Sequence, residues 1–364
     1  MVSMMAKIED GKVMIYDERL ANRFNIRGYG KLIDERYLEL HPVEALYLSE
    51  EKKLKIVDEG NILESDSLFD KFSTLDNRFE QRFIVYRDLR RRGYKINCFH
   101  ELRSKDIDYY LKPKREDQKD IFAVSINERE EFSVEKILSF LDSLDPLIEE
   151  LWAGVVDEEG DITYYRIYDV KPKGSLKDVE NIGCRGVLLK HLIIVKDREI
   201  GKELFKQGFY GNLTDGELTL SLLEALHLSD IGVLEVYSRE RKLEYEDLLT
   251  IAKSYQQDFE IRYKVYKDLK EKGLCVKTGY KFGTHFRAYE RDPNRYHAEY
   301  LLDAVTESFK SNWSNISRGI RLAHSVRKLY VLAVVSKKIR YLSLIHISEP
   351  TRPRLISYAV FCLK

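Results

Sequence analysis

Three side chains in the later half of the chain could take part in acid–base chemistry. Tyr289 closes the phrase Phe286-Arg-Ala-Tyr289, His297 opens the phrase His297-Ala-Glu-Tyr, and Lys328 ends the phrase His324-Ser-Val-Arg-Lys328. A phenol and an imidazole can transfer protons, and an ammonium group can offset a developing negative charge. Each also has a plain structural reading. Tyr289 could be a hydrogen-bonded sheet tyrosine, His297 a histidine at a strand end, and Lys328 a solvated residue at a helix end.

Strands and one helix are expected to position these residues. Runs rich in β-forming residues occur at 274–277, 286–289, 297–302 and 329–335. Before the last of these runs, Ile316, Ile320 and Ala323 recur at the spacing of a helix face. The pattern therefore predicts that Tyr289 ends a strand, His297 begins one, and Lys328 lies between a helix and the next strand.

The chain contains an internal repeat with an offset of 180 residues. Segment 79–93 matches segment 259–273 at eight of fifteen ungapped positions, and the same offset pairs Glu44-Ala-Leu-Tyr-Leu48 with Glu224-Ala-Leu-His-Leu228. An offset of 181 pairs Tyr29-Gly30 with Tyr210-Gly211. A duplication of this kind decides the domain organisation of the whole chain.

Both copies show the same order of expected elements. Each begins with short strands and a helix near Glu44 or Glu224, and continues with a longer helix that stops at Gly93 or Gly273, a typical helix end. The junction between copies is expected near 171–186, where glycine, proline and asparagine favour a loop. The fold class is therefore α/β (α+β), as a tandem duplication.

The two copies carry opposite charge although the whole chain, with 61 basic and 61 acidic residues, is neutral. Residues 277–342 hold thirteen Lys or Arg against five Asp or Glu, whereas residues 97–162 hold eight against eighteen. A stretch as basic as 309–342, which has no acidic residue, suits a polyanion. A solvated face with its counter-charges elsewhere in the fold is the alternative.

The acidic copy contains the phrase Asp157-Glu-Glu-Gly-Asp161 between two hydrophobic runs. This arrangement predicts a hairpin tip that carries Asp157, Glu158, Glu159 and Asp161. Opposite charges in one chain can pair two subunits, so the tip could bind the basic copy of a second chain. A plain exposed turn is an equally good reading of the phrase alone.

Length and composition restrict the class of protein. At 364 residues, 44% hydrophobic and 34% charged, the chain is expected to be globular and to form two domains. Its start meets Lys7, Glu9 and Asp10 too early for a secretory signal, and no apolar run is long enough to span a membrane, so we expect a cytoplasmic protein. Four cysteines without a CxxC pair indicate neither a zinc site nor a disulfide scaffold (Cys98, Cys184, Cys275, Cys362).

Four phrases of the second copy resemble the archaeal tRNA-splicing endonucleases in their two-repeat, homodimeric form. They are Lys277-Thr-Gly-Tyr-Lys-Phe-Gly283, Phe286-Arg-Ala-Tyr-Glu290, His297-Ala-Glu-Tyr-Leu301 and Ile316-Ser-Arg-Gly-Ile-Arg-Leu-Ala-His-Ser-Val-Arg-Lys328. The resemblance continues, in weaker form, across the first copy. It implies repeats with a small N-terminal α/β subdomain and a C-terminal mixed, restriction-endonuclease-like sheet flanked by helices.

The resemblance implies a tRNA-intron lyase that needs neither metal nor cofactor. Its substrate would be precursor tRNA with a bulge-helix-bulge element, cut at both intron boundaries to 2′,3′-cyclic phosphate and 5′-hydroxyl ends. The family's roles would give Tyr289 as general base, His297 as general acid and Lys328 as the group that stabilises the phosphorane. His285 and His324 are rival proton donors, ranked lower because neither occupies the family's histidine position.

Tyrosine needs help to act as a base, because its reference pKa is about 10. We expect a neighbouring cation such as Lys328 to favour the phenolate. For RNA binding, one of two arginines that sandwich a bulged base in the family maps onto Arg321, and Arg318 and Arg327 lie in the same basic stretch. An attacking 2′-hydroxyl would exclude DNA as a substrate.

The first copy is expected to be inactive. At the 180 offset Tyr289 meets Tyr109, but His297 meets Asp117 and Lys328 meets Ile148. The resemblance then gives the 157–161 tip a role, since the family's inactive repeat inserts an acidic loop into the partner subunit's active repeat. We therefore expect a homodimer with an inactive repeat at 1–175 and a catalytic repeat at 176–342.

The end of the chain departs from the family. Residues 343–354 read Ser-Leu-Ile-His-Ile-Ser-Glu-Pro-Thr-Arg-Pro-Arg, which resembles translated adapter sequence. We expect 343–364 to be an artefactual tail and the family's final strand, with its second arginine, to be missing; a genuine divergent tail is the alternative. Two other functions stay open, a metal-dependent nuclease of related fold and a non-catalytic RNA-binding or assembly subunit.

Overall fold

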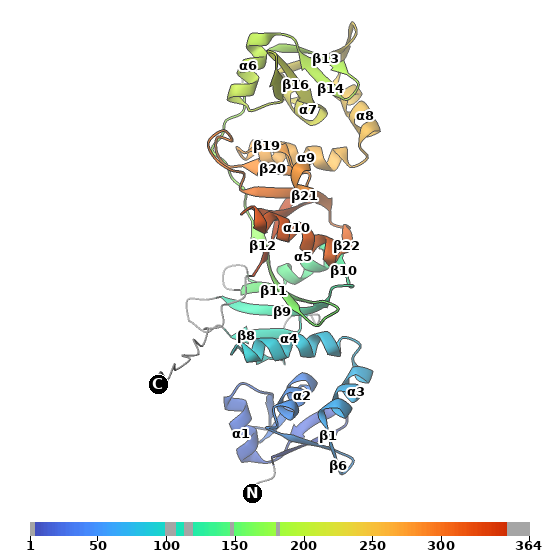
Figure 1. Ribbon diagram of the computed structural model, residues 1–364, viewed down its shortest axis with the longest axis vertical. Helices are drawn as coiled ribbons and strands as arrows, with labels where there is room; N and C mark the ends of the chain where they lie inside the picture. Colours follow the sequence, from blue (N-terminus) through green and yellow to red (C-terminus); the bar gives the residue numbers. More distant parts are fainter. Residues whose placement is uncertain (1–3, 99–106, 113–118, 146–148, 180–182, 348–364) are drawn as a thin grey trace, which may run out of the picture. The chain divides into compact units, whose positions relative to one another are not determined.

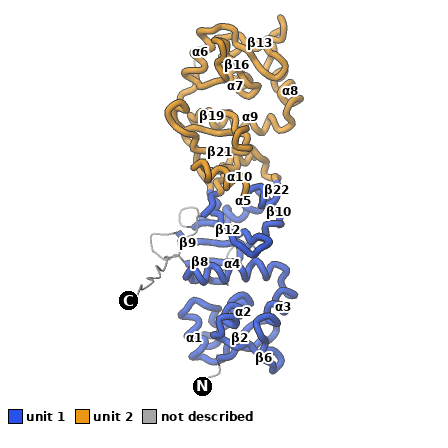
Figure 2. Tube along the Cα trace, in the orientation of Figure 1, with its two compact units in different colours: residues 1–168, 310–316, 345–364 blue, residues 169–309, 317–344 orange. Residues whose placement is uncertain are grey.

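The computed structural model describes the chain except for residues 1–3, 99–106, 113–118, 146–148, 180–182 and 348–364 (Figure 1). It divides into two compact units (Figure 2). Unit 1 contains Met1–Tyr168 together with Lys310–Ile316 and the segment from Ile345, and unit 2 contains Asp169–Phe309 and Ser317–Leu344. Each unit has an N-terminal and a C-terminal part, in agreement with the duplication read from the sequence.

The N-terminal part of unit 1 is a six-stranded sheet with three helices. The strand order is β3-β4-β2-β1-β5-β6. The strands are β1 (Met5–Glu9), β2 (Lys12–Ile15), β3 (Lys31–Ile33), β4 (Tyr37–Leu40), β5 (Lys55–Asp58) and β6 (Asn61–Leu63); the helices are α1 (Glu18–Ile26), α2 (Pro42–Glu50) and α3 (Ser65–Leu75).

The N-terminal part of unit 2 repeats this arrangement, with the strand order β15-β16-β14-β13-β17-β18. The strands are β13 (Cys184–Leu189), β14 (Leu192–Val195), β15 (Asn212–Thr214), β16 (Glu217–Ser221), β17 (Leu234–Ser238) and β18 (Arg241–Leu243); the helices are α6 (Arg198–Gln207), α7 (Leu222–Asp230) and α8 (Tyr245–Tyr255).

The structure explains why a glutamate and a Tyr-Gly pair recur in both copies. Glu44 lies in the first turn of α2 and accepts the backbone N–H of Gly30 at 3.0 Å, and Glu224 in the first turn of α7 accepts the N–H of Gly211 at 2.8 Å. Both glycines have positive φ and pack so closely against β4 and β16 that a Cβ would meet a carbonyl oxygen of these strands at 2.5 and 2.4 Å. Each copy therefore needs both the buried carboxylate and the glycine.

The C-terminal part of unit 1 places α4 (Phe79–Arg91) on strands in the order β12-β11-β9-β8-β7. The strands are β7 (Lys95–Asn97), β8 (Tyr109–Lys112), β9 (Asp120–Asn127), β11 (Glu149–Val156) and β12 (Ile162–Val170). Strand β10 (Glu131–Ser133) leads into α5 (Val134–Asp142) and pairs with β22 (Lys310–Asn312), while Trp313 packs its ring against Phe132 and Tyr165.

The C-terminal part of unit 2 has the corresponding strands in the order β19-β20-β21-β23-β24. They are β19 (Cys275–Thr278), β20 (Phe286–Tyr289), β21 (Tyr300–Thr306), β23 (Leu329–Val335) and β24 (Ile339–His346). Helix α9 (Phe259–Glu271) covers a core that includes Val265, Phe286 and Val331. Helix α10 (Trp313–Ser325) follows β22, and its Gly319 allows close approach to Tyr330. The α+β fold and the tandem duplication are confirmed.

The expectation that the final strand is missing is wrong for residues 339–346. Strand β24 pairs antiparallel with β23 from Val335↔Ile339 to Tyr330↔Leu344. Its Tyr341, Leu342, Ser343 and Leu344 are buried. Strand pairing uses backbone hydrogen bonds. An apolar segment of strand length can therefore pair with the open edge of β23 even when its sequence differs from the family pattern. Residues 348–364 of the expected tail lie outside the described residues.

The connecting segment is the chain between the end of β12 at Val170 and the start of β13 at Cys184, and its first residues are hydrogen-bonded to the rest of unit 2. The backbone N–H groups of Gly174 and Leu176 donate to the carbonyls of Lys272 and Gly273, both at 2.9 Å. Ser175 donates its N–H to the carbonyl of Glu290 at 3.0 Å. The hydrogen bonds of this segment thus link the residues after α9 to Glu290, the residue that follows Tyr289.

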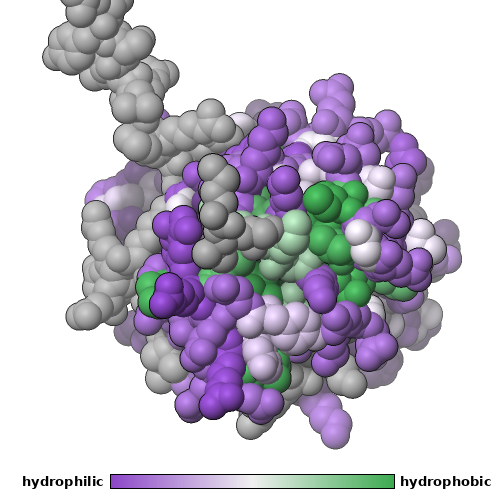
Figure 3. All heavy atoms as spheres, turned by 90° about the horizontal axis from the view of Figure 1, so that it is seen from below, coloured by the Kyte–Doolittle hydropathy of each residue, from purple (hydrophilic) through white to green (hydrophobic). Residues whose placement is uncertain are grey.

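No helix within the described ranges is long and apolar enough to cross a membrane. On the face drawn in Figure 3, hydrophilic side chains surround a smaller hydrophobic area.

Candidate functional site

The strand register of unit 2 gathers the backbones of Tyr289 and Lys328 at one end of the sheet. Antiparallel pairing of β20 with β21 places Ala288 opposite Tyr300, and Glu299 donates its N–H to the carbonyl of Ala288 at 3.1 Å. Parallel pairing of β21 with β23 aligns Tyr300 with Leu329, whose N–H donates to the carbonyl of Glu299 at 2.9 Å. Residue 299 therefore lies between residues 289 and 328.

His297 stands two residues before Glu299, in the short loop that joins β20 to β21. The prediction that His297 begins a strand is wrong, because β21 begins only at Tyr300. The side chain of Asp292 accepts the N–H of Asn294 at 2.9 Å, and its carbonyl accepts the N–H groups of Arg295 and Tyr296 at 3.1 and 3.0 Å. Arg291 lies over the ring of Tyr296 at 4.0 Å. The loop is thus a compact turn that leaves the imidazole of His297 exposed at the same end of the sheet.

Lys328 is half-buried where α10 ends and β23 begins. Its backbone N–H donates to the carbonyl of Ala323 at 2.9 Å, while Arg327 before it has a φ of 56°. The ammonium of Lys328 donates to the carbonyl of Val326 at 3.3 Å and lies 5.9 Å from the centre of the Phe282 ring. These contacts fix the direction in which the strand begins.

The basic stretch is only partly paired. Lys310 forms an ion pair with Glu131 at 2.7 Å, and Arg340 pairs with Asp169 at 2.8 Å. Arg318, Arg321 and Arg327 are exposed and form no ion pair with any described residue. Counter-charges elsewhere in the fold therefore account for two of the cations, and the arginines on and after α10 remain open to solvent.

The cation beside Tyr289 is Arg287, which the sequence analysis did not single out. The guanidinium of Arg287 lies 5.8 Å from the centre of the Tyr289 ring, and its buried Nε has no hydrogen-bond partner among the described residues. Burial raises the pKa of Tyr289, and the charge and hydrogen bond of Arg287 lower it against that trend. Arg287 shares the strand and its alternating face with Tyr289. That Lys328 also favours the phenolate stays a prediction.

The first copy differs at this position. Tyr109, which corresponds to Tyr289, is fully buried and donates its hydroxyl to the carbonyl of Arg82 at 2.7 Å. Arg287 corresponds to Ile107, which is also buried. The phenol of Tyr109 therefore has a structural role in the core of the first copy. Asp117 and Ile148, the counterparts of His297 and Lys328, lie outside the described residues.

The rival His285 is occupied by the fold. Its Nδ1 accepts the backbone N–H of Ala304 at 3.0 Å, and its own backbone N–H donates to Asp303 at 2.9 Å. Burial lowers the pKa of this imidazole, which favours the neutral form that accepts the bond. His285 thus fixes the start of β20. The other rival, His324, is exposed on α10.

The acidic phrase of the first copy forms the hairpin tip that its sequence predicts, between β11 and β12. Asp157 shapes the turn: its carboxylate accepts the N–H groups of Glu159 and Asp161, both at 2.9 Å. Glu158 and Glu159 point to solvent, and Glu158 pairs with the exposed Arg129 at 2.5 Å. The tip therefore presents more negative than positive charge.

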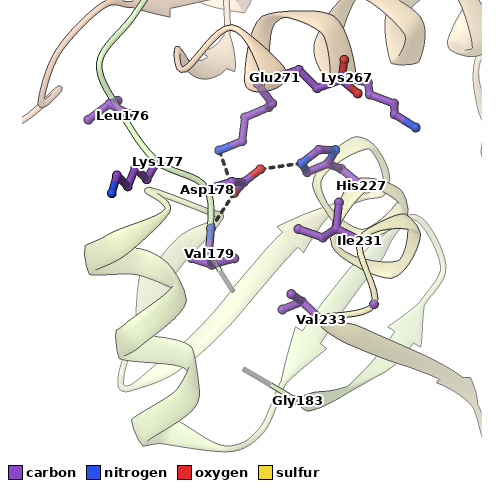
Figure 4. Close-up of a pocket in the computed structure, with 12 residues that line it drawn as sticks. Leu176, Lys177, Asp178, Val179, Gly183, His227, Ile231, Val233, Lys267 and Glu271 are labelled. Carbon is purple, nitrogen blue, oxygen red and sulfur yellow. Dashed lines mark hydrogen bonds and ion pairs between the residues drawn. The ribbon is translucent and has the colours of Figure 1, made fainter. Parts of the chain in front are cut away.

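A pocket of about 960 Å³ lies elsewhere in unit 2, between the connecting segment and α7 and α9 (Figure 4). Its polar centre is Asp178, which accepts from His227 at 2.7 Å, Tyr210 at 2.5 Å and Lys270 at 3.3 Å. Burial raises the pKa of Asp178, but these three donors outweigh burial and hold the pKa below its ordinary value. The cluster anchors the connecting segment and contains none of the sequence-predicted site residues.

Possible metal ligands were also considered. Over the described ranges, His, Cys, Asp and Glu side chains nowhere gather in a group of three or more that could hold a metal ion.

Comparison with known proteins identifies both halves of each copy. The model of the tRNA intron endonuclease N-terminal domain matches residues 4–69 and 184–249, and the model of its catalytic C-terminal domain matches residues 79–164 and 259–341. A tRNA-splicing endonuclease of Methanococcoides burtonii is 32% identical over 92% of this chain and 96% of its own length. One of Methanosarcina mazei is 33% identical over 93% and 97%.

A shorter relative matches only part of the chain. The tRNA-splicing endonuclease of Hyperthermus butylicus is 38% identical over 44% of this chain but over 96% of its own length. The duplicated domains, together with identity above 30% along most of the chain, confirm the resemblance seen in the sequence, and the chain belongs to the tRNA intron endonuclease family.

Proposed function

We propose that this chain is a tRNA-intron lyase that cuts precursor tRNA at both intron boundaries of a bulge-helix-bulge element. The reaction leaves 2′,3′-cyclic phosphate and 5′-hydroxyl ends and needs no metal ion. The observation that carries the proposal is the strand register, which brings residues 289, 297 and 328 to one end of the second copy's sheet. Residues 176–342 are the catalytic repeat, and residues 1–175 are the inactive one.

The proposed reaction is an internal displacement at phosphorus. The phenolate of Tyr289 takes the proton of the ribose 2′-hydroxyl, and the 2′-oxygen forms a bond to the phosphorus atom. The bond from phosphorus to the 5′-oxygen breaks, and this oxygen receives a proton from His297. Lys328 offsets the negative charge on the phosphorane oxygens. The enzyme needs only to align groups that the RNA already contains.

Arg287 supports this chemistry by favouring the phenolate. A buried phenol resists ionisation, and Arg287 is the described cation that acts against this resistance. Arg318, Arg321 and Arg327 bind the RNA, for which their exposure and their lack of an ion-pair partner among the described residues are suitable.

Two active sites, one for each intron boundary, require two chains. We propose a homodimer in which the tip at 157–161 binds the partner's catalytic repeat. The excess of carboxylates on this tip and the excess of Lys and Arg over Asp and Glu in residues 277–342 support that pairing by charge.

The reaction is tested with a bulge-helix-bulge transcript in excess chelator, followed by analysis of the RNA ends. Cyclic phosphate at both boundaries is expected, and cleavage that requires added magnesium would instead indicate a metal-dependent nuclease. His297→Ala should lower the cleavage rate by about 10²–10⁴-fold while RNA binding persists. His191→Ala, an exposed histidine of the N-terminal part of unit 2, is the control and should cleave normally. Unchanged cleavage by His297→Ala would contradict the assignment of the general acid.

A further inference from the structure

A tightly hydrogen-bonded turn joins β19 to β20 and contains the 3-10 turn η1 (Tyr280–Phe282). Gly279 donates its N–H to the carbonyl of His285 at 3.1 Å, and its own carbonyl accepts the N–H of Phe282 at 2.7 Å. The hydroxyl of Thr278 accepts the N–H of Tyr280 at 3.2 Å. Gly283 closes the turn with a φ of 65°. The backbone around Tyr280 is therefore fixed on both sides.

The side chain of Tyr280 is left in solvent by this turn. It is 87% exposed, more than any other large apolar side chain of the described residues. Neither its ring nor its hydroxyl contacts an aromatic, charged or hydrogen-bonding group in the described part of the chain. A fixed turn that holds an aromatic ring away from the protein is suited to a ligand with a flat face.

Two lysines lie close to the turn that carries this ring. Lys281 is the next residue and is exposed. The ring of Phe282 lies 5.9 Å from the ammonium of Lys328, so the turn reaches one residue of the proposed active site although it stands at the end of β20 opposite Tyr289. Single-stranded nucleic acids bind where aromatic rings accompany cations, because bases stack on the rings and phosphates contact the cations. The first copy has His100 and Glu101 at the corresponding sequence positions, so its sequence lacks the pair of tyrosine and lysine.

We propose that Tyr280 stacks on an unpaired base of the RNA that is bound at Lys328, and that Lys281 contacts the neighbouring backbone. The proposal rests on the function proposed above and adds a base-binding position to it. Stacking tolerates every base because each has a flat aromatic face, so the position recognises an unpaired nucleotide whatever its identity.

The test uses the full chain with His297→Ala, which binds RNA without cutting it. The dissociation constant is measured for a bulge-helix-bulge RNA and for a fully paired duplex of equal length. Tyr280→Ala should weaken binding of the bulged RNA by about 5- to 100-fold, the range that corresponds to one base–aromatic stack. Tyr280→Trp should restore it, and a fluorescent base analogue in the bulge should be quenched only when residue 280 is aromatic.

Tyr255→Ala is the matched control, because Tyr255 is another exposed tyrosine of unit 2 and lies on α8. It should leave both affinities unchanged. Equal affinity of Tyr280→Ala and its parent for the bulged RNA would overturn the proposal, and so would an equal loss for duplex and bulged RNA. A change in oligomeric state at unchanged RNA affinity would also overturn it, in favour of a contact between chains. Failure of the proposed reaction would be recognised separately, by the absence of cleavage in the chain that retains His297.

Discussion

The surroundings of Tyr289 have opposing effects on the proposed general base. Burial favours the neutral phenol, whereas Arg287 favours the phenolate by its charge and hydrogen bond. In the first copy the corresponding Ile107 carries no charge, and Tyr109 donates a hydrogen bond into the core. The two copies thus show one tyrosine position in a reactive and in a structural environment, and Arg287 is the described residue that distinguishes them.

Arg287→Ile tests this difference by giving the second copy the residue of the first. Loss of the cation raises the pKa of Tyr289, so less phenolate exists at a given pH, and the rising limb of the single-turnover cleavage rate should move to higher pH. At a pH on the original rising limb, the cleavage rate of the variant should be lower than that of the parent. The loss should not exceed about 10²–10⁴-fold, which is the usual contribution of general base catalysis. Arg287→Lys, which keeps the charge, should return the limb toward its original position. A lower rate with an unmoved pH profile would assign Arg287 a purely structural role.

At the scale of elements, the connecting segment is placed to affect the end of β20. A Cβ on Gly174 would lie 2.0 Å from the carbonyl oxygen of Gly273, so any side chain there must displace the segment. The backbone N–H of Ser175 donates a hydrogen bond to the carbonyl of Glu290, the residue after Tyr289. Displacement of the segment should therefore break or lengthen the hydrogen bond to Glu290 and so change the position of the neighbouring Tyr289.

Gly174→Ala should lower the free energy of unfolding by about 1–3 kcal/mol, the usual cost of forcing extra volume into a packed place. The cleavage rate should fall as well, because the strand end that carries Tyr289 loses its neighbour. Chemical denaturation and single-turnover cleavage measure the two effects. Gly183→Ala in the same segment is the control, since a Cβ there meets no atom within 4 Å. If both variants unfold alike, the close contact at Gly174 does not stabilise the molecule.

The sequence predicted those elements whose pattern is local. The terminating Gly273 predicts the helix before it, and a run of β-forming residues predicts the strand at 329–335. The recurring Glu224 and Tyr210-Gly211 reflect a hydrogen bond that both copies need. Strand β24 was not predicted, because its residues differ from the family pattern and its pairing depends on an open strand edge.

Arg287 was not predicted either, because a basic residue two positions from a tyrosine is common in sequences. Only the strand β20 places the two side chains on one face. Comparison of the two copies could have indicated it, since Ile107 takes its place. The contact of Phe282 with Lys328 joins segments more than forty residues apart, and no local pattern predicts such a distance.

At the scale of the whole molecule, charge is divided between the copies in a way that concerns assembly. The turn between β11 and β12 carries Asp157 and Glu158, while the corresponding turn between β23 and β24 carries Lys337 and Lys338. Opposite charge at equivalent turns lets a chain attract a second copy of itself, and such attraction weakens as salt screens it.

Glu158→Lys with Glu159→Lys reverses this charge at the tip. If the tip binds the partner's basic repeat, repulsion should raise the dimer dissociation constant by about 100-fold or more, because like charges at an interface cost several kcal/mol. Sedimentation equilibrium measures the dimer, and cleavage should fall at low protein concentration and recover at high concentration. Glu64→Lys with Asp70→Lys makes the same change at exposed residues near α3 and should leave dimer and cleavage intact. A dimer that forms with unchanged affinity after reversal of the tip would place the interface elsewhere, since charge attraction at 157–161 would then contribute nothing to assembly.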